Sequence, residues 1–384
     1  MSQTLPPPLT YAMIGGGTGA FIGEVHRKAI ALDHSATLVA GAFSSTPERS
    51  IESARQLGLP HDRSYTTYQE LVKQEASRPD RVDFVVIVTP NDSHHPIAKA
   101  ALEAGFHVVL DKPATQTSEQ AQELIELSKE HNRLCCVTYN YTGYPMVRQA
   151  RALIEANHIG PIRKVFVEYH QGWLASDLES TGQKQASWRV DPHRAGIGGA
   201  IGDIGTHAEN LASFVTGLQP QSIYADLRSF VPNRPLDDDA SVFINYTSGA
   251  HAVLTASQIC IGRGNGLTLR IHGESGSISW NQETPDTLEV TKLNTNPVTY
   301  SRGGPDLHDD ATISTRIPQG HPEGYLEAFA NIYKGATDAI REHNSDQDPS
   351  RLAQLIPTID DGYQGVRFVE CCVQSSRSRA AVNF

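Results

Sequence analysis

A carboxylate and an imidazole stand four residues apart near the middle of the chain, at Asp203 and His207. On a helix this spacing puts both side chains on one face. Imidazole titrates near neutral pH and can take the proton of a hydroxyl group, while the carboxylate orients the imidazole or a substrate. Removal of a hydride from a carbinol carbon needs such a base. A simple surface or capping pair is the alternative at this spacing.

A lysine with a complementary role lies in the segment Asp111-Lys112-Pro113, directly after the apolar run His107–Leu110. Ligands of open parallel sheets bind beyond the carboxyl ends of the strands, so we expect Lys112 to face a ligand. Its ammonium can polarise a substrate oxygen and stabilise a developing alkoxide. Taken alone, a lysine in a loop is a solvated charge.

The elements that must position Lys112 alternate between strand and helix, which predicts a doubly wound parallel sheet with right-handed crossovers. We place this α/β domain, of the Rossmann type, at residues 11–143, after a polar, proline-rich and disordered stretch at 1–10. The predicted strands are Tyr11–Ile14, Leu38–Phe43, Val82–Val88, His107–Leu110 and Cys135–Tyr139, and the predicted helices are Val25–Leu32, Pro47–Leu57, Ser93–Ala104 and Ser118–His131.

The loop after the first predicted strand is rich in glycine. Gly15 and Gly17 fit the first two positions of the dinucleotide-binding pattern G-x-G-x-x-G, but the third fitting glycine, Gly23, comes three residues late. Glycines allow a tight turn there and let backbone N–H groups approach a pyrophosphate at a helix N-terminus. We therefore expect Phe21 and Ile22 to border a cofactor. A glycine-rich turn without a ligand is the alternative.

The end of the second predicted strand indicates which nicotinamide nucleotide binds. It holds Phe43-Ser44-Ser45, where NAD-binding domains usually carry an acidic residue. The hydroxyls of Ser44 and Ser45, with Arg49 one helical turn further on, can bind a 2'-phosphate that a carboxylate would repel. The sequence favours NADP and leaves NAD open. Alternatively, Ser45 only caps the helix that starts at Pro47, and Arg49 is a solvated charge.

The second half of the chain, residues 144–384, has longer alternating strands with short turns, which is typical of a mostly antiparallel open sheet. We expect an α+β domain for substrate binding and oligomerisation, with the late helices packing back on the first domain. An uncovered sheet face favours a homodimer or homotetramer. The predicted strands are Lys164–Tyr169, Ser222–Ser229, Ser241–Tyr246, His251–Gln258 and Leu267–His272; a long loop through Ser187–Pro192 and Gly196–Gly205 precedes a helix ending at Gly217, and the late helices are Glu323–Ile340 and Ile359–Gln374.

Together the motifs resemble the glucose-fructose oxidoreductase and inositol dehydrogenase family, also called Gfo/Idh/MocA. Four motifs occur in the family's order, and two later segments extend the resemblance nearly to the end of the chain. The motifs are Ile14-Gly15-Gly16-Gly17, Thr89-Pro90-Asn91-Asp92-Ser93-His94, the stretch 104–113 ending in Asp111-Lys112-Pro113, and Gly202-Asp203-Ile204-Gly205-Thr206-His207; the later segments are 271–278 and 361–364.

The resemblance implies roles for individual residues. Lys112, Asp203 and His207 take the family's catalytic positions, and Asp111 stands where relatives usually carry Glu, one methylene longer. Packing at strand ends is the alternative for Gln171 and Trp173. The implied cofactor-binding residues are Thr89, Pro90, Asn91, His94, Asp111, Lys112 and Asn140, and the implied substrate-binding residues are Lys112, Tyr141, Gln171, Trp173, Arg189, Asp203, His207 and His321.

The resulting hypothesis is an NAD(P)-dependent oxidoreductase that transfers a hydride between nicotinamide and a carbinol or ketone carbon of a sugar or cyclitol. His207 removes the hydroxyl proton, Lys112 hydrogen-bonds to that oxygen and Asp203 holds the sugar. The alternative is a nicotinamide-binding sensor of the same fold without turnover. Such relatives tend to lack the lysine or histidine, so the presence of both favours the enzyme.

Composition excludes several other classes. The net charge of -11 and the lack of any Lys/Arg run argue against nucleic acid as a partner. No apolar stretch approaches the roughly 20 residues that span a bilayer. Two adjacent pairs, Cys135-Cys136 and Cys371-Cys372, lie in apolar surroundings and suit buried thiols in a reducing cytoplasm. No metal is expected: the pairs lack CxxC spacing, and a zinc site from His94, His95, His193 and His207 lacks a ligand cluster.

Overall fold

The computed structural model describes residues 7–384 and divides into two compact units. The first comprises residues 7–114, 119–140 and 329–362, and the second comprises 115–118, 141–328 and 363–384. The first unit is thus discontinuous in sequence, unlike the single division predicted between residues 143 and 144. Of the two late helices expected to pack on the first domain, most of the earlier one belongs to the first unit, whereas most of the later one belongs to the second.

The first unit contains the predicted parallel sheet, in the strand order β2-β1-β3-β4-β5. The order reverses between β1 and β3, which makes this pair the topological switch point where ligands of such sheets bind. β1 starts inside the stretch predicted to be disordered, because Leu9 and Thr10 pair with Ala36 and Thr37; residues 1–6 of that stretch lie outside the described part of the chain. The strands are β1 (Leu9–Gly15), β2 (Ala36–Ala42), β3 (Phe84–Val88), β4 (His107–Leu110) and β5 (Cys135–Val137).

The helices of the first unit follow the predicted alternation with two differences. α1 begins at Phe21, four residues before the predicted start at Val25. α3 was not predicted, although Thr67 accepts a hydrogen bond from Glu70 N in the pattern of a capping box. The helices are α1 (Phe21–Leu32), α2 (Pro47–Gln56), α3 (Tyr68–Ala76), α4 (His94–Glu103), α5 (Ser118–Glu130, its first residue grouped with the second unit) and most of α11 (Tyr325–Asn344).

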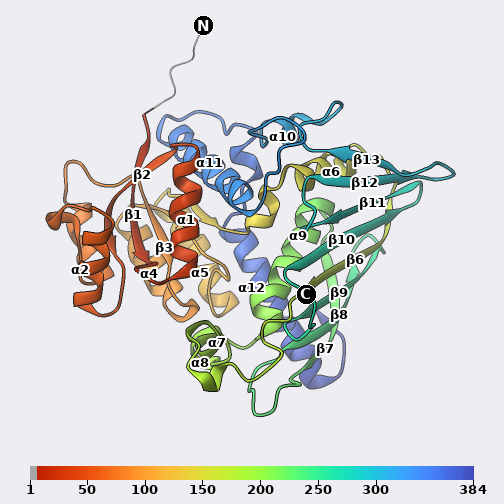
Figure 1. Cartoon of the computed structure of the whole chain (residues 1–384), viewed down its shortest axis with the longest axis horizontal. Helices are drawn as coiled ribbons and strands as arrows, with labels where there is room; N and C mark the ends of the chain where they lie inside the picture. Colours follow the sequence, from red (N-terminus) through yellow and green to blue (C-terminus); the bar gives the residue numbers. More distant parts are fainter. Residues whose placement is uncertain (1–6) are drawn as a thin grey trace, which may run out of the picture. The chain divides into compact units, whose positions relative to one another are not determined.

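The second unit contains a nine-stranded sheet that is antiparallel except for the pair β6 and β9. Figure 1 shows its strands side by side from β13 to β7. The five predicted strands are present, whereas β11, β12, β13 and β14 were not predicted. In sheet order the strands are β13 (Val298–Ser301), β12 (Thr287–Lys292), β11 (Gly276–Asn281), β10 (Gly266–Gly273), β6 (Ile162–His170), β9 (His251–Ser257), β8 (Asp239–Tyr246), β7 (Pro220–Arg228) and β14 (Val382–Asn383).

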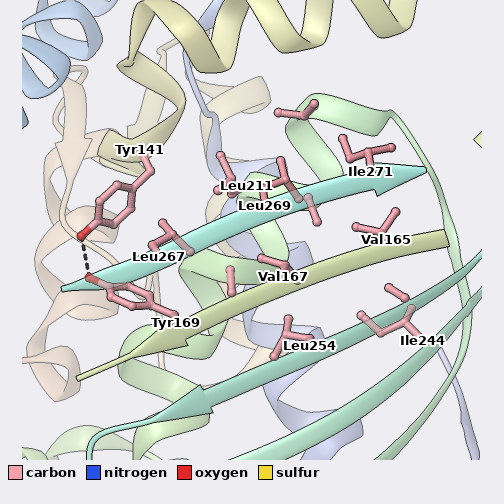
Figure 2. Packing of buried hydrophobic residues seen from close by; sticks show 14 of the residues in the cluster. Tyr141, Val165, Val167, Tyr169, Leu211, Ile244, Leu254, Leu267, Leu269 and Ile271 are labelled. Atoms are coloured by element: carbon pink, nitrogen blue, oxygen red, sulfur yellow. Dashed lines mark hydrogen bonds between the residues drawn. The ribbon is translucent and has the colours of Figure 1, made fainter. Parts of the chain in front are cut away.

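One face of this sheet and the helices packed on it form the core of the second unit. Alternate strand residues such as Val165, Val167 and Leu254 point into that core, where they meet Leu211 of α9 (Figure 2). The predicted long loop contains two short helices and a π-helical turn, Ile201–Gly205, that leads into α9. The helices are α6 (Pro145–Glu155), α7 (Lys184–Arg189), α8 (Pro192–Ala195), α9 (Thr206–Thr216), α10 (Asp309–Thr312) and most of α12 (Ile359–Ser378).

Candidate active site

The register of the parallel sheet brings several predicted cofactor-binding segments to one edge. Gly15 pairs with Val88, Ile87 with Leu110, and Leu110 with Val137. Parallel strands end at the same edge, so the glycine loop, the segments 89–94 and 111–113, and Asn140 all follow carboxyl ends of neighbouring strands. This is the position at which doubly wound sheets bind nucleotides.

The glycines of the loop are required by close backbone contacts. Gly15 has φ +83°, and a Cβ there would lie 2.7 Å from Thr89 Cγ2 and 2.8 Å from Val88 O. A Cβ on Gly23 would overlap the backbone of Gly16, so Gly23 allows α1 to pack on the loop. Close helix packing is the function of the third glycine in the dinucleotide-binding pattern. Gly23 serves it despite its late position.

The start of α1 can receive an anion. Its N-cap residue, Ala20, provides no side-chain cap, and the first N–H groups of a helix lack partners within the helix. Two hydrogen bonds hold the glycine loop in place: Gly17 N donates to Phe43 O, and Thr18 N donates to Ser53 Oγ. Phe21 is 68% exposed, so its side chain leaves the helix end open. These features fit a pyrophosphate held by backbone N–H groups.

The segment after β2 is open to solvent where a nucleotide ribose would bind. Ser45 and Arg49 are exposed and Ser44 is partly buried. The N-cap of α2 is Thr46, which corrects the alternative that Ser45 caps this helix. Ser44 Oγ instead accepts a hydrogen bond from Thr46 N at 3.2 Å.

His94 joins two of these strand-end segments. Its side chain is buried, with Nδ1 at 2.8 Å from Pro113 O and Nε2 at 2.9 Å from Thr89 O. Among the residues described, Thr89 Oγ1 and Asn140 Nδ2 are buried polar atoms without a hydrogen-bond partner. Such atoms are costly unless a ligand or water satisfies them. They fit a polar ligand at this edge of the sheet.

Asp111 anchors the turn that carries Lys112. Its Oδ1 accepts hydrogen bonds from Lys112 N and from Thr138 Oγ1, each at 2.9 Å. Burial acts to raise the pKa of this carboxyl. The proximity of His26, whose Nε2 lies 3.8 Å from Oδ1, and the charges of Lys112 and His94 outweigh burial and hold the pKa of Asp111 well below its ordinary value. Asp111 is therefore ionised at neutral pH.

In the second unit, the π-helical turn and the start of α9 carry the predicted pair. Asp203 lies on the turn and His207 in the first turn of α9. Asp237 fixes the start of this turn, because its two carboxylate oxygens accept from Gly199 N at 2.7 Å and Ile201 N at 2.8 Å. π-helical turns are rare and often occur at functional sites. Here the turn sets the direction of Asp203 relative to α9.

Asp203 is held by two side chains from other elements. Its Oδ2 accepts from Arg189 Nε of α7 at 3.1 Å and from Gln258 Nε2, just after β9, at 2.8 Å. The guanidinium of Arg189 also lies 4.3 Å from the centre of the Trp188 ring. Arg189 was predicted as a substrate-binding residue, whereas Gln258 was not.

His207 lies in a setting of tyrosines. The centre of its ring lies 4.9 Å from the centre of the Tyr141 ring, in an edge-to-face arrangement, and 6.2 Å from the centre of the Tyr169 ring. The hydroxyls of Tyr141 and Tyr169 are 2.5 Å apart (Figure 2), and Tyr169 Oη donates to Asn265 Oδ1 at 2.7 Å. Burial raises the pKa of Tyr141 above its ordinary value, so the phenol stays neutral and can donate.

The same network contains Gln171 and Trp173. Trp173 Nε1 donates to Gln171 Oε1 at 2.9 Å, and Gln171 Nε2 donates to Asn265 Oδ1 at 2.9 Å. Both side chains thus make polar contacts beyond strand-end packing. His321 is exposed in the loop before α11. Its carbonyl oxygen accepts a hydrogen bond from Arg302, so this contact involves the backbone of His321 and not its imidazole.

Sequence reasoning did not single out three members of this network. Tyr169 was predicted only as the last residue of a strand, and Gln258 and Asn265 flank the ends of β9 and β10. Each of the three has a polar or amphipathic side chain at the end of a strand, and this is the only feature of the sequence that could have indicated them. The feature is weak evidence without the sheet order, because it is the pairing of β6 with both β9 and β10 that brings these strand ends together.

Within residues 7–384, no group of three or more His, Cys, Asp or Glu side chains is arranged to hold a metal ion. None of the helices in the same range is long and apolar enough to cross a membrane. Cys135, Cys136, Cys371 and Cys372 are free and buried, as predicted.

Comparison with known proteins matches both halves of the chain. Residues 9–139 match an oxidoreductase family with an NAD-binding Rossmann fold, and residues 147–279 match the GFO/IDH/MocA C-terminal domain. The chain is 37% identical to the uncharacterized oxidoreductase YfiI of Bacillus subtilis, over 97% of this chain and 96% of the relative. It is 29% identical to levoglucosan dehydrogenase of Pseudarthrobacter phenanthrenivorans, over 98% of each chain.

Solved structures of an inositol dehydrogenase homolog from Azotobacter vinelandii are also similar. Its complex with NAD+ has a TM-score of 0.95 and 38% identity, covering 100% of this chain and 99% of that one. Its complex with NADH and myo-inositol has a TM-score of 0.91 and 37% identity, covering 98% of each chain.

Proposed function

The chain belongs to the Gfo/Idh/MocA family of oxidoreductases and is a nicotinamide-dependent dehydrogenase acting on CH–OH groups, and from this we propose that it oxidises a ring hydroxyl of a cyclitol or sugar. The inositol dehydrogenase homolog binds myo-inositol, and the levoglucosan dehydrogenase is named for an anhydrosugar. These relatives support a neutral, hydroxyl-rich ring as the substrate class.

The observation that carries the proposal is the network in the second unit. Asp203 presents a carboxylate, Arg189 a guanidinium, and Gln171, Gln258 and Asn265 amides. These groups lie on neighbouring elements and offer both donors and acceptors. A polyol ring has several hydroxyls that each donate and accept, so it suits such a set better than an apolar or strongly charged ligand does.

Three residues have separate roles in the proposed mechanism: one accepts the proton, one stabilises the alkoxide and one orients the substrate. His207 accepts the proton of the reacting hydroxyl, because imidazole combines moderate basicity with a fixed position against Tyr141. Lys112 donates a hydrogen bond to the same oxygen and stabilises the developing alkoxide. Asp203 accepts a hydrogen bond from a neighbouring hydroxyl and orients the ring. A bound nicotinamide supplies the hydride acceptor.

For the nucleotide we propose that NADP is accepted in addition to NAD. Ser44, Ser45 and Arg49 follow β2, and none of them brings a negative charge to the position of the ribose 2'-oxygen. The complexes of the similar Azotobacter vinelandii protein contain NAD+ and NADH. A 2'-phosphate would gain the charge of Arg49, whereas a 2'-hydroxyl would use only the serine hydroxyls.

We also propose that the protein is a homodimer or homotetramer that uses the outer face of the nine-stranded sheet. Tyr224 and Phe243 lie directly opposite each other on β7 and β8 and are 44% and 53% exposed. The same row continues through Val253 and Phe166. A row of apolar side chains on an open sheet face suits burial against a second copy.

The testing experiment measures binding and turnover separately. NADH and NADPH are titrated by fluorescence, and inositols, pyranoses and anhydrosugars are then assayed at the reduced-nicotinamide absorbance band. We expect turnover on at least one ring polyol, a loss of kcat of about 10²- to 10⁴-fold in His207→Gln and Lys112→Ala, and nucleotide affinity within about threefold of wild type. Lys129→Ala, an exposed lysine of α5, is the control.

Near-normal turnover in either variant would remove that residue from the mechanism. Tight nucleotide binding without turnover on any ring polyol would contradict the proposed substrate class.

A further inference from the structure

A guanidinium group is enclosed in the second unit, outside the network that we assign to the substrate. The side chain of Arg234, in the connection between β7 and β8, is 1% exposed. A guanidinium has five N–H donors in a rigid planar fork, and a buried donor without an acceptor is unfavourable. Five acceptor atoms surround this one. They are Leu174 O at 3.1 Å, Ser176 O at 3.3 Å, the two carboxylate oxygens of Glu179 at 2.9 and 3.0 Å, and Asp238 Oδ2 at 3.1 Å.

Glu179 connects this guanidinium to the element that carries Arg189. It is the first residue of the short helix Glu179–Thr181, and α7 begins three residues after that helix ends. Ser187 Oγ of α7 donates to Glu179 O at 3.5 Å. Hydrogen bonds from Arg234 lower the pKa of Glu179, so the two side chains keep opposite charges at neutral pH. The pair therefore anchors the segment that leads into α7.

Asp238 connects the same guanidinium to Gln258. The side chain of Asp238 is 1% exposed, and its carboxylate also accepts from two backbone N–H groups in the loop after β7. Gln258 N donates to Asp238 O at 2.9 Å, and Leu174 N donates to Gln258 O at 3.1 Å. The backbone of Gln258 is thus held on both sides by residues that Arg234 contacts.

These two connections meet at Asp203. Arg189 Nε and Gln258 Nε2 are the two donors that hold Asp203 Oδ2. We propose that Arg234 is a positioning residue for substrate binding, because both side chains that hold Asp203 depend on segments that it anchors. A displacement of either donor would turn the carboxylate, and a hydrogen bond from a substrate hydroxyl weakens steeply with distance and angle. The inference rests on the proposed role of Asp203 in holding a ring hydroxyl.

Stability alone does not account for this cluster. Taking a guanidinium and its carboxylate partners out of water costs free energy that offsets most of their attraction. What the fork provides is direction, since its donors are fixed in one plane and join two separate segments. A lysine carries the same charge on a flexible stem with only three donors. Arg234→Lys therefore separates the geometry of the fork from its charge.

The primary test is 19F NMR of the full chain without substrate. The chain has three tryptophans, and 5-fluorotryptophan gives one signal for each. Trp173 directly precedes the segment that Arg234 anchors and Trp188 lies in α7, whereas Trp280 is 2% exposed in the core of the same unit. Substitution of each tryptophan by phenylalanine assigns the signals. We expect Arg234→Lys to shift the Trp173 and Trp188 signals and to leave the Trp280 signal in place.

Kinetics on the polyol that the wild type oxidises fastest provide the functional readout. Arg234→Lys should raise KM by about 10-fold, lower kcat by less than about threefold and keep the Kd for NADH within about twofold. Loss of folded protein alone would lower the apparent kcat and leave KM unchanged. Glu179→Gln keeps the size of the partner without its charge and should show the same pattern with smaller changes.

The control is Arg163→Lys, which makes the same exchange at an exposed arginine of β6 that pairs with Glu274. It should match the wild type in the 19F spectrum and in both kinetic constants. Where Arg234→Lys does not fold, Glu179→Gln replaces it in both measurements, because the Glu179 side chain is partly exposed and its substitution leaves the guanidinium in place.

Trp173 and Trp188 signals that stay at their wild-type positions in Arg234→Lys overturn the inference. Shifted signals beside an unchanged KM also overturn it, since the anchored segments would then not position the substrate. A wild-type protein that oxidises no ring polyol contradicts the proposed function instead, and the 19F spectra still decide whether Arg234 anchors these segments. The two failures are therefore distinguishable.

Discussion

Arg189 Nε donates a hydrogen bond to Asp203 Oδ2 across 3.1 Å, and the two residues come from different elements, α7 and the π-helical turn before α9. The guanidinium also lies over the Trp188 ring at 4.3 Å. Arg189 therefore orients the carboxylate that we assign to substrate binding, and it adds a planar donor next to that carboxylate. Adjacent hydroxyls of a polyol can donate to Asp203 and accept from Arg189 at the same time.

Arg189→Leu should weaken substrate binding more than catalysis. We expect KM for the polyol to rise by about 10-fold, in line with about 1.5 kcal/mol for a hydrogen bond to a charged group, while kcat falls by less than about threefold. Arg189→Lys should recover part of the loss, because it restores charge without the planar donor set. Steady-state kinetics measure both values, with Arg194→Ala on the exposed helix α8 as the control. An unchanged KM would exclude Arg189 from substrate contact.

Arg49 should discriminate between the two nicotinamide nucleotides. Arg49→Ala is expected to raise the Kd for NADPH by about 10-fold or more and to change the Kd for NADH by less than about twofold, because only NADPH carries the 2'-phosphate. Fluorescence titrations of both nucleotides give the two constants. Arg55→Ala is the matched control, since Arg55 lies on the same helix and pairs with Glu52. Equal changes for both nucleotides would show that Arg49 does not read the phosphate.

The outer face of the nine-stranded sheet should control assembly. Phe243→Glu places a charge in the row that Tyr224 and Phe243 form, so we expect the dissociation constant of the oligomer to rise at least about 10-fold. Light scattering after size exclusion, over a range of protein concentrations, measures this change. Phe230→Glu is the control, because Phe230 is 63% exposed but lies beyond the end of β7. A wild-type protein that is monomeric at all concentrations would rule out the proposed homo-oligomer.

Much of the first unit was predictable because its signals are local. Buried parallel strands appear as continuous apolar runs, and the residues that follow them lie at one edge whatever the detailed packing. This logic found Lys112 from its position after a strand end, whereas the roles of Thr89 and Asp111 were implied by the family resemblance. The start of α1 was predicted four residues too late. Phe21 and Ile22 directly follow a glycine turn, and no pattern of apolar residues marks them as the first helical turn.

The second unit was less predictable because its site depends on pairings between distant segments. Gln258 and Asn265 reach the site through the register of β6 with β9 and β10, which no local pattern specifies. β11 to β13 are short and separated by tight turns, so their alternation is brief. His26 was overlooked for another reason: its partner Tyr333 is 307 residues away in sequence.

Asp237 should make the stability of the protein depend on pH. Burial raises its pKa from 3.8 to about 6 against the opposing effect of two backbone N–H donors. Between these values the folded state holds a proton that the unfolded state has released. The free energy of unfolding therefore contains a contribution that is complete below about pH 4 and is lost as pH rises through 6.

Asp237→Asn removes this titration. From pH 4.5 to 7, the wild type should lose about 2 kcal/mol relative to the variant, measured by guanidinium unfolding at each pH. The variant is expected to be the less stable protein at acid pH, because its amide nitrogen opposes the N–H of Gly199 or Ile201. Asp226→Asn, which removes an exposed acid of β7, should keep the wild-type pH dependence. Parallel pH curves for wild type and Asp237→Asn would mean that this carboxyl titrates alike in the folded and unfolded states.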